Sequence, residues 1–336
     1  MARVTLEDIA KACQVTKGLV SRSLAGKYNV SEETRARIAQ KAAELGYDTT
    51  HLRKKKETIN RVLLVISSRM LLKEDYWQPI IKSLSRVLDM RSISLEYFVY
   101  GDNKIDEEQL KHLVSLKTNA YVIIHNNPEN IVDLLKKTCK PIVEVDPKIF
   151  HSDGITKVKF SNYDSTYLAV EALIENKHKI IAFYGSDMHS TSFRERHEGF
   201  LASINAHNSE GVKGISIIFN NKNLNYSDDV LLEKNLRKYP ITALICANDI
   251  IAERAYVVIR SMGKKIPDDI SVIGFDNIKN SCYFDPPLST YNVPREELGK
   301  EVANYLIGVF GENQLQFSEI VIRCGYVPRD SVKKLS

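Results

Sequence analysis

The sequence has no long apolar run. Nowhere in its 336 residues does it approach the roughly 20 consecutive apolar residues that a membrane helix requires. Near the N-terminus, Glu7 and Asp8 stand where a cleaved signal peptide needs an apolar segment, which argues against export by such a signal. We therefore expect a cytoplasmic protein that has no membrane partner.

Cysteine is scarce, and the common catalytic motifs are missing. The five cysteines lie far apart with no C-x-x-C pair, which excludes a zinc ribbon or a disulfide scaffold and fits a reducing compartment. There is no phosphate-binding loop, no G-x-G-x-x-G, no G-x-S-x-G, and no metal-binding spacing among the eight histidines. We expect no cofactor, no metal and no enzymatic activity.

Positive charge is concentrated at the N-terminus. Residues 1–61 contain 13 Lys or Arg and 7 Asp or Glu, whereas the rest of the chain carries a net charge of −1. Such an asymmetry indicates a nucleic-acid contact near the N-terminus. The alternative is a solvated basic face with no partner.

The first 47 residues predict three short helices. Thr5 and Asp8 have capping-box spacing, Thr16 is a second N-cap candidate and Ser31 a third. Gly26 and Gly46 end the second and third helices. Two short helices separated by about four residues are typical of a helix-turn-helix. The predicted core of the bundle consists of Leu6, Ile9, Val15, Leu19, Val20, Leu24, Ile38 and Leu45.

The second helix is the expected reader of DNA. In a helix-turn-helix this helix enters the major groove with its N-terminus first. Lys17 and Arg22 can donate to guanine, while Thr16 or Ser21 can hold phosphate. Gly18 removes one possible contact within this helix. The alternative is a three-helix bundle with an ordinary polar surface.

From Arg61 onward, short apolar runs alternate with amphipathic segments. The apolar runs span 62–66, 121–124, 141–145, 180–185, 215–219, 243–247 and 270–275. Helical segments are predicted at 76–90, 165–176, 194–206, 249–262 and 295–309. This alternation predicts parallel sheets with helices on both faces, and about ten strands favour two such sheets. A ligand would bind in the cleft where two lobes face each other.

The chain resembles the lactose-repressor/galactose-repressor (LacI/GalR) family. The first part of the match is Val4–Ala10, Val20–Gly26, Val30–Arg35 and Leu45–Tyr47. The second part comprises Tyr76–Trp77, Arg196–Phe200, Cys246–Asp249, Ile270–Asn277 and Pro286–Thr290. The resemblance implies an all-α helix-turn-helix domain followed by a periplasmic-binding-protein-like α/β core of two doubly wound lobes.

The resemblance also implies boundaries. We expect the DNA-binding domain at 1–47, a hinge at 48–60 and the effector-binding and dimerisation core at 61–330. The N-lobe would span about 61–160 and 291–320, and the C-lobe about 161–290 and 321–330, with crossings near 160, 290 and 320. The C-terminus lacks the leucine heptads of a tetramer, so a homodimer is expected.

The hinge departs from the family pattern. The Pro-Asn that usually follows the tyrosine is absent, and Lys56 lies near the position of the leucine that wedges into the minor groove. Leu52 is the remaining apolar candidate. We hypothesise that this protein bends DNA less than its relatives and depends more on phosphate contacts. The predicted DNA contacts are Thr5, Thr16, Lys17, Ser21, Arg22, Tyr28, Asn29, Leu52, Arg53, Lys54, Lys55 and Lys56.

The cleft contains polar and aromatic candidates for binding an effector. Arg196 offers five donors, Asp276 can accept from two hydroxyls, and Asn248 can donate and accept. Asp249 is expected to cap the helix that follows it. The alternatives to an effector contact are a structural salt bridge for Arg196, a strand-end cap for Asp276, a loop carboxylate for Asp146, core packing for Trp77 and a polar loop for Tyr226. The predicted effector contacts are Tyr76, Trp77, His125, Asp146, Ser192, Arg196, Tyr226, Asn248 and Asp276.

The resulting prediction is a transcription regulator, most simply a repressor of a catabolic operon. Its expected partners are a palindromic double-stranded operator and a small effector, with a sugar or sugar phosphate first and a nucleoside or purine second. One alternative is a global regulator that responds to a phosphorylated carrier protein. The other is an α/β enzyme that carries a DNA-binding head for autoregulation.

Overall fold

We describe the chain from a computed structural model. The described residues are 4–24, 30–47, 60–72, 74–101, 105–125, 129–147, 154–186, 190–220, 225–312 and 318–336. The chain divides into two compact units, Met1–Ile59 and Asn60–Ser336, and each is described by itself. We call them the head and the core.

The head contains three helices, α1 (Leu6–Cys13), α2 (Lys17–Leu24) and α3 (Glu32–Glu44). The predicted caps are confirmed: Thr5 and Asp8 form a capping box, and the Ser31 side chain accepts from the Thr34 amide. Hydrogen bonds from Thr5 lower the pKa of Asp8. The buried centre of the head is made by Ile9, Ala10, Cys13, Val20, Ile38 and Ala42.

One predicted core residue of the head lies outside this centre. Leu45 is 37% exposed, so the prediction that it faces inward is wrong. Leu45 follows the last turn of α3, and the chain turns at Gly46 with φ +70°. Tyr47 packs against the buried cluster instead. The turn therefore gives the inward position to the aromatic side chain.

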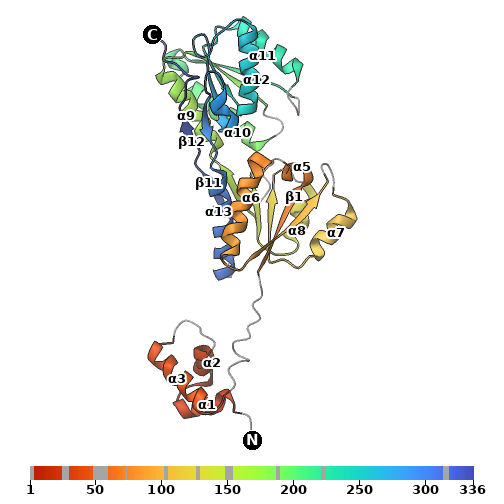
Figure 1. Cartoon of the computed structure of the whole chain (residues 1–336), viewed down its shortest axis with the longest axis vertical. Helices are drawn as coiled ribbons and strands as arrows, with labels where there is room; N and C mark the ends of the chain where they lie inside the picture. Colours follow the sequence, from red (N-terminus) through yellow and green to blue (C-terminus); the bar gives the residue numbers. More distant parts are fainter. Residues whose placement is uncertain are drawn as a thin grey trace. The chain divides into compact units, whose positions relative to one another are not determined.

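The core has two six-stranded sheets, which define its two lobes (Figure 1). The N-lobe sheet has the order β11-β5-β4-β3-β1-β2 and the C-lobe sheet the order β12-β10-β9-β8-β6-β7. All the pairings are parallel except that of β10 with β12. The N-lobe strands are β1 (Arg61–Ser67), β2 (Ser94–Tyr100), β3 (Ala120–Ile124), β4 (Ile142–Val145), β5 (Thr156–Phe160) and β11 (Glu319–Ile322). Those of the C-lobe are β6 (Ile180–Gly185), β7 (Lys213–Ile218), β8 (Ala243–Cys246), β9 (Ser271–Asp276), β10 (Ser289–Asn292) and β12 (Gly325–Val327).

Helices cover both faces of the N-lobe sheet (Figure 1). They are α5 (Ser68–Leu71), α6 (Glu74–Asp89), α7 (Glu107–Ser115), α8 (Glu129–Lys136) and α13 (Arg295–Glu312). Because side chains alternate along a strand, Val62 and Leu64 of β1 share a cluster with α6, while Leu63 and Val65 share another with α7 and α8. α13 packs closely on α6, where Gly299 approaches the backbone at Ile80.

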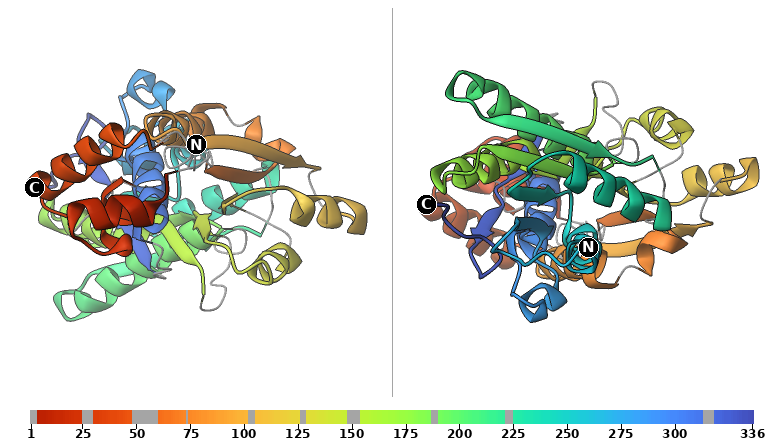
Figure 2. Two further views of the ribbon diagram at one scale, coloured as in Figure 1. Left: turned by 90° about the horizontal axis from the view of Figure 1, so that it is seen from below. Right: turned by 90° about the horizontal axis from the view of Figure 1, so that it is seen from above.

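The C-lobe sheet is likewise covered on both faces (Figure 2). Its helices are α9 (Asn162–Glu175), α10 (Thr191–Ala206), α11 (Tyr226–Lys238) and α12 (Asp249–Ser261), with short 3-10 turns at Asn208–Glu210 and Lys279–Tyr283. α9 and α10 pack together, and Phe200 of α10 contacts Phe183 of the sheet. α11 and α12 also pack together. The five amphipathic segments predicted from the sequence all overlap helices of the core, and the seven apolar runs overlap strands.

The chain passes between the sheets three times: after β5, after β10, and between β11 and β12. These passages bring the ends of strands from both sheets near one another. The predicted fold class, a helical head with a two-lobed α/β core, is confirmed. In the part of the chain that the structure describes, no helix combines the length and the apolar character needed to cross a membrane.

Candidate functional site

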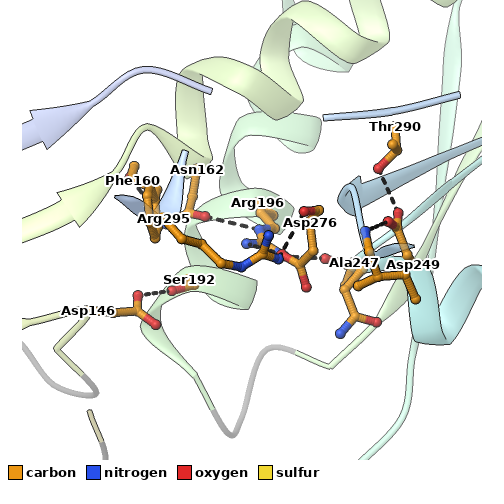
Figure 3. A network of polar contacts seen from close by, with 12 residues as sticks. Asp146, Phe160, Asn162, Ser192, Arg196, Ala247, Asp249, Asp276, Thr290 and Arg295 are labelled. Carbon is orange, nitrogen blue, oxygen red and sulfur yellow. Dashed lines mark hydrogen bonds and ion pairs between the residues drawn. The ribbon is translucent and has the colours of Figure 1, made fainter. Parts of the chain in front are cut away.

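Arg196 lies at the centre of a polar network in the core (Figure 3). It projects from α10, and only 2% of its surface is exposed. Its Nε donates to Asn162 Oδ1 at 3.0 Å, one terminal nitrogen donates to the Ala247 carbonyl at 2.5 Å, and the other donates to Asp276 Oδ1 at 3.3 Å. The guanidinium carbon also lies 3.6 Å from the centre of the Phe275 ring. Hydrogen bonds and stacking thus hold a buried cation in one orientation.

Three predicted site residues sit where parallel strands end. His125 follows β3, Asp146 follows β4, and Asp276 is the last residue of β9. Their φ angles are +26°, +48° and +105°. Residues other than glycine seldom adopt such angles, and this kind of strain clusters at ligand-binding positions. Because these ends are also where ligands bind in open α/β sheets, the strain supports a binding site here.

Asp146 connects the two lobes. Its Oδ1 accepts a hydrogen bond from the hydroxyl of Ser192 on α10 of the C-lobe (Figure 3). His125 Nδ1 lies 2.8 Å from the Asp146 carbonyl oxygen and 3.4 Å from Oδ2. The structure therefore brings together Asp146, Ser192 and His125, which the sequence analysis had predicted separately.

Asp276 faces two arginines. Burial raises the pKa of its carboxyl group, while the positive charges of Arg196 and Arg295 oppose that shift. Arg295 donates to the Asp276 carbonyl oxygen at 2.9 Å, and its guanidinium carbon lies 4.8 Å from the centre of the Tyr76 ring. Burial raises the pKa of the Tyr76 hydroxyl well above its usual value. Arg295, which was not predicted from the sequence, thus contacts both Tyr76 and Asp276.

Asn162 and Arg295 are the functional candidates that sequence reasoning did not find. Asn162 begins α9 directly after the first passage between sheets, and Arg295 begins α13 after the second. The crossings had been predicted near 160 and 290, so polar residues just after them were the available signal. Neither residue belongs to a motif that would have marked it.

Two predicted aromatic contacts do not join the polar network around Arg196. Trp77 is 2% exposed and belongs to the apolar core, with its ring 4.8 Å from Tyr76 and 5.7 Å from His125. This burial favours the alternative of core packing. Tyr226 is 79% exposed at the first turn of α11. The structure does not place it among the residues that surround Arg196.

Asn248, and not Asp249, caps the helix α12. Asn248 is the N-cap of α12, and its Oδ1 accepts from the Ile251 amide at 2.9 Å, so the prediction that Asp249 caps this helix is wrong. Asp249 is fully buried and accepts from Thr290 Oγ1 at 2.6 Å and from the Ile278 amide at 2.8 Å. Burial raises the pKa of Asp249 to about 7. Its hydrogen bonds tie α12 to the strand ends that carry Asp276.

The head presents the predicted reading helix to solvent. Thr16, Lys17 and Arg22 are exposed, and Ser21 is half-buried. Thr16 Oγ1 accepts a hydrogen bond from the Leu19 amide at 3.3 Å and so satisfies a backbone donor in the first turn of α2. Lys17 Nζ lies 3.3 Å from Glu7 Oε2, and Arg22 Nε donates to the Gly18 carbonyl at 3.2 Å. The predicted contacts Tyr28, Asn29, Leu52, Arg53, Lys54, Lys55 and Lys56 lie outside the described residues.

Comparison with known proteins identifies two domains of the chain. Residues 5–50 match the family described as "Bacterial regulatory proteins, lacI family", and residues 170–332 match "Periplasmic binding protein-like domain". The chain therefore combines a domain of the lacI family of bacterial regulatory proteins with a periplasmic-binding-protein-like domain. The predicted resemblance is thereby confirmed.

Curated relatives in the lacI family match over nearly the full chain. The Ribose operon repressor of Bacillus subtilis (strain 168) is 28% identical over 343 residues, covering 98% of this chain and 99% of the relative. The HTH-type transcriptional repressor PurR of Aliivibrio salmonicida (strain LFI1238) is 27% identical over 344 residues, with 98% and 99% covered. The Probable HTH-type transcriptional repressor ExuR of Bacillus subtilis (strain 168) is 25% identical, with 99% of each chain covered.

Solved structures of lacI-family proteins share the fold. A "transcriptional regulator CelR-cellobiose complex" has a TM-score of 0.67 at 22% identity, covering 98% of this chain and all of that one. The Lac repressor dimer bound to operator and the anti-inducer ONPF has a TM-score of 0.66 at 20% identity, with 99% of this chain and 100% of that chain covered. These likenesses support the two-domain, two-lobe description given above.

Proposed function

We propose that this lacI-family regulator is a cytoplasmic transcription repressor, controlled by a small polyhydroxylated effector held between the two lobes. The observation that carries the proposal is the Arg196 network, which gathers donors and acceptors at the strand ends of both sheets. Carboxylates that accept and a guanidinium that donates suit a ligand rich in hydroxyl groups. The proposal makes the protein a binder of its effector and assigns it no reaction.

The names of relatives and structural neighbours favour a carbohydrate effector. One relative is a ribose operon repressor, and solved neighbours were obtained with cellobiose, ribose or glucose bound. Because PurR proteins are also among the relatives, a purine is the second candidate class of effector. We assign Tyr76, His125, Asp146, Ser192, Arg196, Asn248 and Asp276 to the effector site.

In the proposed mechanism, DNA is bound by a homodimer that presents two heads to a palindromic operator. Lys17 and Arg22 of α2 read bases in the major groove, and the basic run Arg53–Lys56 contacts phosphate. Effector binding changes how the lobes close through the cross-lobe contacts Asp146–Ser192 and Arg295–Asp276. The effector shifts the equilibrium between arrangements only by its difference in affinity for them.

The test is selection of purified full-length protein on a random duplex pool at physiological salt, followed by sequencing. We expect a palindrome with two half-sites, which gives the operator. The selection is then repeated with a variant of Arg22 to show that α2 does the reading. Recovery of DNA without a common sequence, both with and without sugars or purines added, would contradict the proposal.

A further inference from the structure

Arg295 crosses the proposed effector site. It is the first residue of α13 in the N-lobe, and it donates to the carbonyl of Asp276 in the C-lobe. In Figure 3 its side chain extends toward Asp276. The ring of Tyr76 lies 4.8 Å from the guanidinium carbon. Arg295 is thus held between groups of both lobes and is half-buried.

The guanidinium of Arg295 makes no direct ion pair in the described parts of the chain, although its charge acts on the nearby Asp276 carboxyl group. Within the described parts of the chain, no carboxylate oxygen lies within 4.0 Å of its guanidinium. Its Nε is buried without a hydrogen-bond partner, and its one hydrogen bond within these parts goes to a backbone carbonyl. Leaving a charged donor buried and unpaired is costly, so this guanidinium is arranged to receive an acceptor.

The carboxylates of the site are already engaged. Asp276 Oδ1 accepts from Arg196 at 3.3 Å. Asp146 accepts from Ser192 and lies 3.4 Å from His125. Among the described residues, no side-chain acceptor is bonded to Arg295, which makes a bound ligand the candidate acceptor. A guanidinium matches the paired oxygens of a carboxylate or a phosphate, with two parallel N–H groups.

We propose that Arg295 is the anion-recognition residue of this site and that the effector is an acidic sugar, carrying a carboxylate or phosphate group beside its hydroxyls. This inference rests on the proposed function, because it takes the Arg196 network as the effector site. Asp146, Ser192 and Asp276 hold the hydroxyl groups, and Arg295 selects the charge. The aromatic face of Tyr76 keeps the guanidinium plane in position.

The experiment measures thermal stabilisation and calorimetric binding of the full-length protein with acidic and neutral sugars. The carboxylates are D-galacturonate, D-glucuronate and D-gluconate, the phosphates are D-glucose 6-phosphate and D-ribose 5-phosphate, and the neutral sugars are D-galactose, D-glucose and D-ribose. We expect at least one anion to raise the Tm and its neutral counterpart to leave the Tm unchanged. The carboxylate and phosphate arms identify which group Arg295 binds.

Substitution of Arg295 tests the assignment to this residue. R295M should weaken binding of that anion at least about 30-fold, because a charged, bidentate hydrogen bond is lost. R295K keeps the charge without the fork and should bind with intermediate affinity. R237M is the matched control, because Arg237 is an exposed arginine paired with Glu233 on α11. If R295M fails to fold, binding of the anion by R295K is compared with its binding by R237M instead.

Two results would overturn the inference. One is that none of the anions binds more tightly than its neutral counterpart, and the other is that the Arg295 variants bind the anion as the wild type does. Binding of a neutral sugar in the same panel, abolished by R196M, would leave the proposed function standing while the inference fails. Loss of operator selection would instead count against the proposed function, whatever the panel shows.

Discussion

Lys159 Nζ of the N-lobe lies 2.7 Å from Glu195 Oε1 of the C-lobe. The same ammonium lies 2.7 Å from Glu319 Oε1 on β11. Glu195 Oε2 accepts from Asn162, whose other amide atom accepts from Arg196. Burial opposes the charge on Lys159, but hydrogen bonds to Glu195 and Glu319 outweigh it and raise its pKa. A continuous polar chain thus links the N-lobe sheet to the centre of the proposed effector site.

Breaking this ion pair should destabilise the core. Lys159 and Glu195 side chains are 15% and 8% exposed, so K159M leaves a largely buried carboxylate without its cation. We expect a loss of about 2–3 kcal/mol in the free energy of unfolding. In thermal unfolding, the double variant K159M/E195Q should lose about 1–2 kcal/mol less unfolding free energy than the two single variants lose together. K300M, which removes an exposed pair with Glu297, should cost under about 0.5 kcal/mol. Additive losses in the cycle would contradict the coupling.

Arg196 neutralises Asp276. Removing Arg196 should therefore lower the free energy of unfolding by leaving the charge of Asp276 unpaired. R196M leaves the Asp276 carboxylate buried, and we expect a loss of about 3–5 kcal/mol in unfolding free energy at pH 8. Adding D276N should restore part of the loss, because the unpaired charge disappears. The control is R194M, which changes an exposed arginine of the same helix. Equal Tm values for R196M and R196M/D276N would show that the charge of Asp276 does not cause the loss.

Residues predicted to contact bases and residues predicted to contact phosphate should differ in how their substitution changes the salt dependence of DNA binding. R22M should lower the binding free energy by about 1–3 kcal/mol through one base pair of the half-site and relax sequence selection at that base pair. The triple variant K54A/K55A/K56A should weaken binding to all sequences and reduce the salt slope by roughly one unit for each phosphate that the hinge no longer neutralises. Both are measured by titrating the selected operator at several salt concentrations. A wild-type slope no steeper than that of the triple variant would refute the phosphate role of the hinge.

Two glycines of α13 should respond oppositely to alanine. A Cβ at Gly299 would lie 2.2 Å from the Ile80 carbonyl oxygen, whereas a Cβ at Gly308 meets nothing within 4 Å. G299A should force α13 away from α6 and cost about 3 kcal/mol or more. G308A should stabilise the helix by up to about 1 kcal/mol. Thermal unfolding of both variants checks this, and a neutral G299A would mean that the two helices can separate freely.

Glu144 should make stability depend on pH. It is 2% exposed on β4, and its Oε2 has no partner in the described chain. Burial raises its pKa to about 7, Lys157 opposes the shift and Asp146 adds to it. Because the folded protein holds this proton more tightly than the unfolded chain, the contribution to stability is present at acidic pH. It is lost as the pH rises toward and through about 7.

The matched variant is E144Q, which cannot ionise. Its stability relative to the wild type should rise by about 2–3 kcal/mol between pH 5 and pH 8. E198Q, at a 54% exposed glutamate side chain of α10, should show no such change. Denaturant titrations at both pH values measure the difference. A constant difference across this range would mean that Glu144 does not titrate there.

Local features of the chain were predictable because a few neighbouring residues encode them. The Thr5 capping box, the Ser31 cap and the apolar strand runs depend on spacing within about one turn or one strand. Asp146 and Asp276 were predicted on the same ground, since strand ends are the binding edges of such sheets. The prediction of Leu45 failed where a turn at Gly46 decides which side chain faces inward.

By itself, the sequence determined the three-helix head, the two-lobed α/β class and the family, because caps, periodicities and contiguous motifs are local properties of the chain. Only the tertiary structure decided the composition of the site. Asn162 and Arg295 reach Arg196 and Asp276 because strand order and three passages between the sheets bring distant residues together. The same packing buries Trp77 and leaves Tyr226 in solvent. No spacing along the chain encodes those distances, since they follow from how whole sheets and helices meet.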